Sequence, residues 1–145
     1  MAELIRLENE ILSRQAKLLQ VRIGATKIRV HGDYHLGQVL NTGKDVVITE
    51  FEGEPARPMS ERKMKRPAMQ DIADILRSFH YAIYSAPSQQ QALSEDDTEF
   101  LKIWAERWAE WMKQLFMDVY LETVGRATFI PADPAAFYIC SMLIF

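Results

Sequence analysis

A carboxylate and a side-chain amide stand five residues apart in a polar, glycine-rich stretch, His-Gly-Asp-Tyr-His-Leu-Gly-Gln at 31–38. They are Asp33 and Gln38, and two further carboxylates, Glu50 and Glu52, follow in a second polar stretch. A carboxylate can accept the proton of an attacking hydroxyl, and carboxylate and amide oxygens are ligands that suit Mg²⁺. These residue types at this spacing indicate phosphoryl transfer.

The residues between the two stretches predict a β-hairpin that would bring them together. Val39-Leu40 and Val46–Ile48 flank the turn Asn-Thr-Gly-Lys, in which Gly43 can supply a positive φ. A tight hairpin folds a second loop, over 50–58, back beside the first. Upstream, Thr26–Val30 alternates polar and apolar residues and predicts a short strand.

Helical periodicity predicts three long helices around this region. The first covers 3–22 and ends before Gly24, the second starts at Pro67, and the third runs from about 95 to 124 and ends at Gly125. The second helix has apolar residues at helical spacing, namely Ile72, Ile75, Leu76, Phe79 and Ile83. The third has an apolar stripe that is expected to lie in the core, namely Leu101, Trp104, Trp108, Trp111, Leu115 and Val119. A last helix is expected near Pro134, and the fold class is α+β with helices dominant.

Composition excludes several classes of protein. The chain has 145 residues, 48% of them hydrophobic, which is enough for the core of one domain. Its single cysteine excludes a disulfide framework and suits a cytoplasmic location. No apolar run approaches the ~20 residues that span a membrane, and a net charge of −3 gives no reason to expect nucleic acid as a partner.

The order of loop, hairpin and acidic loop resembles the aminoglycoside-phosphotransferase-like kinases, which have a protein-kinase-like fold. Three strings carry the resemblance further: the one at 31–38, Phe-Glu-Gly-Glu-Pro-Ala-Arg-Pro at 51–58, and Asp71 through Leu76-Arg77-Ser78-Phe79. Together, over residues 3–137, they are similar to the maltokinases. Those enzymes phosphorylate maltose at its anomeric hydroxyl with ATP and are often fused to trehalose synthase. The resemblance implies a kinase C-terminal lobe that makes maltose 1-phosphate for α-glucan synthesis.

The resemblance also implies a role for individual residues. Asp33 is the implied catalytic base for the sugar hydroxyl. Three residues are implied as Mg²⁺ ligands: Gln38, Glu50 and Glu52. Three others are implied in support: His31, His35 and Asp71. Among these, the Asp71 carboxylate would hold backbone amides of the catalytic loop, and His35 would lie near the phosphate path.

Two departures from the family pattern stand out. Glu50 is one methylene longer than the Asp that the family has there, and Mg²⁺ tolerates little error in ligand geometry. The six glycines form no cluster that could cover the phosphates of a nucleotide. The N-terminal lobe is therefore expected to be absent, and no nucleotide-binding residue is assigned. The uncharged apolar tail over 137–145 suggests a truncated or frameshifted end.

The expected organisation is a partial kinase C-lobe over 1–145. It comprises the helix 3–22, a segment 26–58 with the catalytic loop, hairpin and metal-binding loop, and a helical subdomain 67–145 that forms a sugar-binding wall. In that wall the tryptophans of the third helix could stack on sugar instead of packing in the core. The expected partners are maltose and either a trehalose synthase domain or the missing lobe. Two alternatives remain: a kinase for an aminoglycoside or choline, and an inactive fragment that serves as an interaction module.

Overall fold

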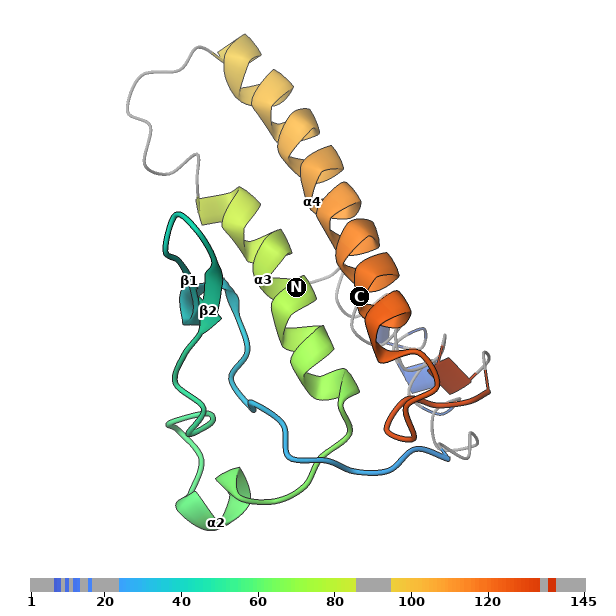
Figure 1. Ribbon diagram of the computed structural model, residues 1–145. Coiled ribbons are helices and arrows are strands. Elements are labelled where there is room, and N and C mark those ends of the chain that lie inside the picture. The colour runs from blue at the N-terminus through green and yellow to red at the C-terminus, as the bar shows by residue number, and fades with distance from the viewer. Residues whose placement is uncertain are drawn as a thin grey trace.

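A computed structural model describes residues 24–85 and 95–133, together with residues 7, 8, 10, 12, 13, 16, 136 and 137. The described residues within 3–22 are helical, as are those at 136 and 137. The rest of the predicted first and last helices, the linker 86–94 and the apolar tail lie outside the described residues. The elements follow in the order η1 (Leu36–Gln38), β1 (Val39–Asn41), β2 (Val46–Ile48), α2 (Met59–Arg62), α3 (Met69–Ser85) and α4 (Glu95–Val124) (Figure 1).

Helix α3 provides the centre of the core, as its periodicity predicted. Every apolar position of the predicted stripe is buried, and Leu76 is fully inaccessible. Burying a side chain of this size contributes roughly 1.5–3 kcal/mol. Because α3 has a single continuous apolar stripe, one face of it is fixed against the rest of the molecule.

Helix α4 runs back alongside α3, so the two form an antiparallel pair (Figure 1). Its bounds match the prediction, but the face that it buries does not. Ala109 is fully inaccessible, while Met112, Phe116 and Tyr120 pack against the core of α3. The ring of Phe116 meets that of Phe79 edge-on, with centroids 6.1 Å apart.

The prediction that the tryptophan stripe of α4 lies in the core was wrong. Trp104 and Trp111 are 60% and 64% exposed, and Leu101, Leu115 and Val119 are exposed as well. Trp108 has one edge-on contact with Phe79 but is also exposed. Apolar residues occupy more than one face of α4, so periodicity alone could not choose between them. The buried face is the one that carries Ala109 together with the residues that pack against the α3 core.

The hairpin forms as predicted, whereas the strand over 26–30 does not. Strands β1 and β2 pair antiparallel with Val39 opposite Ile48, and Gly43 has a φ of 82° in the turn. Within 26–30 only Ile28 pairs, in an isolated bridge with Arg66. Arg66 is followed by Pro67 and then by α3, and the N–H of Thr26 donates to the Thr128 carbonyl, so no partner strand runs along 26–30 in the described part of the chain.

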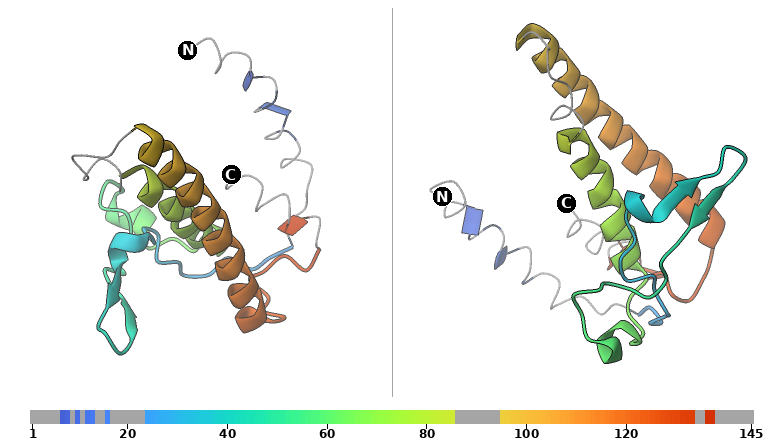
Figure 2. Two further views of the ribbon diagram at one scale, coloured as in Figure 1. Left: turned by 90° about the horizontal axis from the view of Figure 1, so that it is seen from above. Right: turned by 90° about the vertical axis from the view of Figure 1, so that its left-hand side faces the viewer.

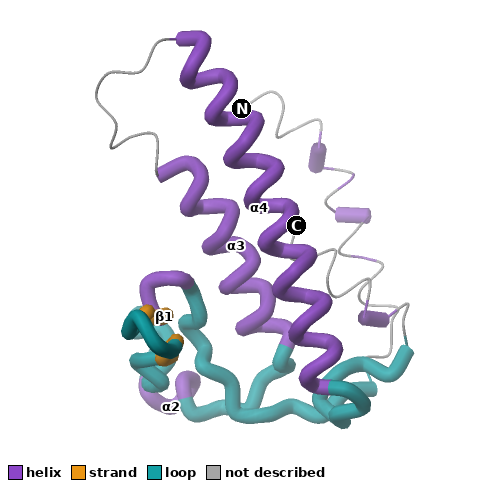
Figure 3. Tube along the Cα trace, turned by 45° about the horizontal axis from the view of Figure 1, so that its top comes forward, coloured by secondary structure: helices purple, strands orange, loops and turns teal. Residues whose placement is uncertain are grey.

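Helix α3 lies between the hairpin and α4, which Figures 1 and 3 show from two directions. The views in Figure 2 show the hairpin projecting from the helical pair. The loop that enters the hairpin contacts α3 through η1. None of the helices in the described part of the chain is long and apolar enough to cross a membrane.

Candidate functional site

The Asp71 carboxylate, in the first turn of α3, holds the start of the glycine-rich loop. Its Oδ2 accepts a hydrogen bond from the backbone N–H of His31 at 2.7 Å, and its Oδ1 accepts one from that of Gly32 at 2.8 Å. Bonds of an N–H to a charged acceptor are among the stronger hydrogen bonds in proteins. One carboxylate on a rigid helix therefore fixes the backbone immediately before Asp33.

The His31 side chain ties the two loops together. Its ring is buried, and Nε2 lies 2.7 Å from the carbonyl oxygen of Thr49. The ring Nδ1 accepts a hydrogen bond from the backbone N–H of Asp33 at 3.3 Å. Since a carbonyl can only accept, these partners assign the neutral tautomer with the proton on Nε2. His31 thus links the loop that carries Asp33 to the loop that carries Glu50.

Two glycines allow the loops to cross at close range. Gly32 and Gly53 have φ values of 81° and 79°. A Cβ on Gly32 would lie 3.6 Å from the Cα of Gly53, and a Cβ on Gly53 would lie 3.4 Å from the carbonyl oxygen of His31. These distances are ordinary van der Waals contacts, so the positive φ values are what favour residues without a side chain here.

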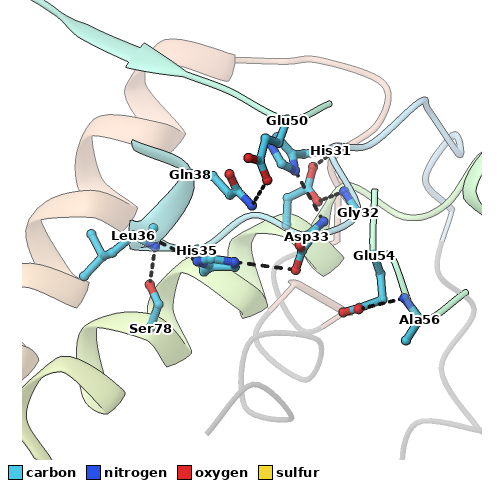
Figure 4. Close-up of polar contacts among 12 residues, drawn as sticks. His31, Gly32, Asp33, His35, Leu36, Gln38, Glu50, Glu54, Ala56 and Ser78 are labelled. Atoms are coloured by element: carbon cyan, nitrogen blue, oxygen red, sulfur yellow. Dashed lines mark hydrogen bonds and ion pairs between the residues drawn. The ribbon is translucent and has the colours of Figure 1, made fainter. Parts of the chain in front are cut away.

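Asp33 and His35 lie side by side on the loop (Figure 4). The Asp33 Oδ1 is 3.8 Å from the Nε2 of His35, and the Asp33 side chain is only 21% exposed. His35 caps η1, because its Nδ1 accepts the backbone N–H of Gly37 at 3.1 Å. On the α3 side, the hydroxyl of Ser78 accepts the backbone N–H of Leu36 at 3.1 Å. The loop is thus anchored on both sides of Asp33.

Gln38 and Glu50 are brought into direct contact by the hairpin. The Gln38 Nε2 donates to the Glu50 Oε2 at 3.0 Å (Figure 4). The Thr49 N–H donates to the Gln38 carbonyl at 2.9 Å. Glu50 has a φ of 60° and is the one non-glycine residue with positive φ among those described. Such a conformation is costly for a residue with a Cβ and is found preferentially at functional sites.

Glu52 is not part of this pair. It is exposed, and it forms no hydrogen bond or ion pair with another described residue. The structure therefore brings together Asp33 with His35, Gln38 with Glu50, and Asp71 with the loop backbone. Among the described residues there is no group of three or more His, Cys, Asp or Glu side chains that could hold a metal ion.

A cavity of about 630 Å³ opens beside Asp33. Its walls come from the glycine-rich loop, the loop over 50–58 and one face of α3. Besides Asp33 and His35, its polar lining consists of Glu54, Arg57, Gln70, Asp74, Arg77, Ser78, Tyr81 and Ser85. A cleft lined by a few convergent polar groups next to a carboxylate is typical of a ligand site.

Sequence reasoning missed most of this lining. Asp74, Arg77, Ser78 and Tyr81 stand at three- and four-residue spacing, so they form a polar stripe next to the apolar stripe of α3. That spacing was visible in the sequence. The sequence did not show which loop the polar stripe faces, because this depends on where Asp71 anchors the glycine-rich loop.

Negative charge gathers at this end of α3. Burial raises the pKa of Asp74, and the nearby Asp71 and Asp33 raise it further, while Arg57 and Arg77 act against them. Burial and the charge of Asp71 also raise the pKa of Tyr34 and of Tyr120. A group that carries a positive charge would relieve this repulsion.

Comparisons with known proteins point to sugar kinases. No protein-family model matches the chain. A glucosamine kinase of Mycolicibacterium smegmatis (strain ATCC 700084 / mc(2)155) is 37% identical over 82 residues, which is 56% of this chain and 21% of that protein. A glucosamine kinase of Streptacidiphilus jiangxiensis is 25% identical over 112 residues, 74% of this chain and 23% of that protein.

Solved structures agree on the fold. A glucosamine kinase in complex with glucosamine, ADP and inorganic phosphate superimposes with a TM-score of 0.77 at 20% identity, over 99% of this chain and 32% of that one. Crystal form B of a glucosamine kinase gives 0.76 at 22% identity, over 96% and 32%. The chain shares the fold of this part of glucosamine kinase. It spans about a third of the solved chains and under a quarter of the curated relatives.

These relatives refine the expectation from the sequence motifs. This chain is mostly helical with a two-stranded antiparallel sheet, and it shares its fold with a part of the glucosamine kinases. The resemblance to a sugar kinase therefore holds. Its finer part, maltose as the sugar, rests on the motif strings alone, because the relatives named here are glucosamine kinases.

Proposed function

We propose that this chain is the acceptor-binding and catalytic-loop part of an ATP-dependent sugar phosphotransferase. The observation that carries the proposal is the position of Asp33 at the wall of a cavity large enough for a sugar. The backbone before Asp33 is held there by the two hydrogen bonds that the Asp71 carboxylate accepts, which we call the Asp71 clamp. The glucosamine kinase relatives and the ADP in one of their structures support the reaction class.

In this proposal Asp33 is the base. Its carboxylate accepts the proton of a sugar hydroxyl while that oxygen bonds to the γ-phosphorus, and the bond from phosphorus to the ADP oxygen breaks. The products are a sugar phosphate and ADP. His35, with its Nε2 3.8 Å from Asp33 Oδ1, and Asp71, through the loop backbone, are positioning residues.

Gln38 and Glu50 fit the ligand chemistry of Mg²⁺. They present an amide and a carboxylate within hydrogen-bond distance of each other, and a Mg²⁺ ion at a kinase site completes its shell with phosphate oxygens and water. When bound, the ion would neutralise charge that develops on the phosphates. Glu50 and Gln38 would hold it, with the Gln38 amide turned so that its oxygen faces the ion. Glu52 lies exposed two residues after Glu50 on the same loop, and its role as a third ligand stays a prediction.

The acceptor that we propose is glucosamine, following the relatives, with maltose as the second candidate. The string Phe-Glu-Gly-Glu-Pro at 51–55 favours maltose, because it is shared with the maltokinases that the sequence resembles. A trehalose synthase domain as partner belongs to this second candidate and stays a prediction.

The test is phosphate transfer by this chain joined to the part of the Mycolicibacterium glucosamine kinase that lies outside the matched residues. ADP release would be measured with Mg²⁺ and ATP in the presence of glucosamine, maltose or choline. We expect sugar-dependent ADP release, and Asp33→Asn should lower its rate by about 10²–10⁴-fold, the usual contribution of a general base.

A matched control removes a carboxylate elsewhere. Glu122→Gln deletes one negative charge on the exposed surface of α4 and should leave the rate unchanged. Equal rates for Asp33→Asn and the unaltered protein would overturn the role of Asp33. Complete absence of sugar-dependent ADP release would favour the inactive-module alternative.

A further inference from the structure

Asp74 is a carboxylate that forms no hydrogen bond and no close ion pair in the described part of the chain. It lies on α3 three residues after Asp71 and lines the cavity beside Asp33. Asp71 uses both oxygens to accept backbone N–H groups, whereas Asp74 forms no hydrogen bond or ion pair with another described residue. It is half-buried, so it has also lost part of its hydration. A carboxylate in this condition gains from a cationic ligand.

The other charged groups of the cavity form no close ion pair with Asp74. Arg57 and Arg77 line the same space and attract its charge, which opposes the rise of the Asp74 pKa, but neither comes within the 4 Å of an ion pair with it in the described structure. Glu54 already accepts the backbone N–H of Ala56 at 3.2 Å. Asp33 is taken by its proposed role as base. Among the carboxylates of this lining, Asp74 is the one that forms no hydrogen bond or ion pair in the described structure and has no other role in the proposed reaction.

Neutral sugar groups have other partners in the cavity. Gln70 offers an amide, and the exposed ring of Tyr81 offers an aromatic face at the wall. Ser78 is already engaged, because its hydroxyl donates to the Ile75 carbonyl and accepts from Leu36 N–H. Hydroxyl recognition thus does not require Asp74, whereas recognition of a positive charge does.

We propose that Asp74 is a specificity-determining residue that binds the protonated amino group of the acceptor sugar, so that the site selects amino sugars over neutral sugars. This inference rests on the proposed function, since it assigns the cavity to the acceptor. A cavity of about 630 Å³ admits a monosaccharide or a disaccharide, so size does not distinguish glucosamine from maltose. The positive charge of the glucosamine amino group does distinguish them.

Glucose is the sharpest competitor for the test, because it differs from glucosamine by a hydroxyl in place of the amine. Binding of each sugar to this chain would be measured by isothermal titration calorimetry, at a pH where the amine is protonated. We expect glucosamine to bind about tenfold more tightly than glucose, the factor that corresponds to 1.4 kcal/mol. Asp74→Asn should remove this preference while leaving glucose affinity unchanged. Asp74→Glu, which keeps the charge, should retain part of it.

The preference for glucosamine over glucose is then measured in catalysis. In the joined protein described above, kcat/KM for glucosamine divided by that for glucose should fall about tenfold in Asp74→Asn and stay constant in Glu122→Gln. Circular dichroism checks that each variant is folded. A purely structural role for Asp74 would change both rates together and leave the ratio intact.

Three outcomes distinguish failure of this inference from failure of the proposed function. If the unaltered protein phosphorylates glucosamine and glucose with equal kcat/KM, the inference is overturned and the proposed function stands. If it prefers glucosamine and Asp74→Asn keeps that preference, the amine is bound elsewhere and the inference is again overturned. If no sugar is phosphorylated, both are overturned.

Discussion

At the scale of single residues, carboxylates with the same chemistry do different work because their surroundings differ. Asp71 is saturated with backbone N–H donors and acts as a clamp. Asp33 stands at a cavity wall with His35 as its neighbour, while Asp74 forms no hydrogen bond or close ion pair with another described residue. Residue type alone could not have distinguished these three aspartates. The contacts that each one makes in the structure do distinguish them.

The clamp predicts a loss of stability when Asp71 loses its charge. Asp71→Asn replaces one carboxylate oxygen by an N–H₂ group that faces a backbone donor, so one hydrogen bond is lost and the other is weakened. We expect the free energy of unfolding to fall by about 1.5–3 kcal/mol, as is usual for hydrogen bonds to a charged group. Urea unfolding measures this directly.

A second readout for the same variant is the titration of two tyrosines. The Asp71 charge adds to burial in raising the pKa of Tyr34 and Tyr120. In Asp71→Asn both should ionise at a lower pH than in the unaltered chain, which the ultraviolet absorbance of phenolate reports. An unchanged tyrosine titration would contradict the position assigned to the Asp71 charge.

At the scale of elements, the pair of helices α3 and α4 provides the platform, and the loops are fixed to it. The core side of α4 is the face with Ala109, Met112, Phe116 and Tyr120, and the tryptophan stripe is exposed. This assignment can be tested by comparing one aromatic residue from each face.

Phe116→Ala should be much more harmful than Trp111→Ala. Phe116 packs on the α3 core and meets Phe79 edge-on, so its truncation leaves a cavity and should cost roughly 2–3 kcal/mol, somewhat less than for a fully buried ring. Trp111 is 64% exposed, and its replacement should change stability by about 0.5 kcal/mol or less. Thermal unfolding of the two variants is the measurement. A larger loss for Trp111→Ala would mean that α4 buries its other face.

The sequence was informative about elements where one pattern was sufficient. The stripe of α3 has one apolar face, and the hairpin has a turn that only a glycine-containing stretch makes easily, so both were predicted. Helix α4 has apolar residues on several faces, and the extended segment around Ile28 lacks a partner strand beyond Arg66. In both cases the outcome depended on a neighbour that local patterns do not specify.

The candidate site divides in the same way. Asp33, Gln38 and Glu50 could be named because they stand at fixed offsets within short motifs. Asp74 and Arg77 could not, since their meeting with the loop depends on the clamp at Asp71 and on the crossing at Gly32. Glu52 lies in the motif but is exposed and takes no part in the hydrogen bond between Gln38 and Glu50, so its predicted role as a ligand stays a prediction.

At the scale of the whole molecule, the concentration of carboxylates at one end of α3 makes stability depend on pH. Burial, with Asp71 and Asp33, raises the pKa of Asp74 above the ordinary value of 3.8, against the opposing effect of Arg57 and Arg77. A raised pKa in the folded state means that folding disfavours the charged form. The stability associated with Asp74 is therefore fully present below pH 3.8 and is lost as the pH rises through the raised value.

Asp74→Asn should accordingly make the protein more stable at neutral pH, although the same change removes the proposed amine contact. We expect a rise in Tm on the order of 1–2 °C, kept small because half of the group remains in water, and no difference from the unaltered chain below pH 3.8. Thermal unfolding at the two pH values, with Glu122→Gln as the control for a lost surface charge, tests this. A lower Tm for Asp74→Asn at neutral pH would show that Asp74 stabilises the fold. A higher Tm together with weaker glucosamine binding is the pattern of a residue retained for its ligand at the expense of stability.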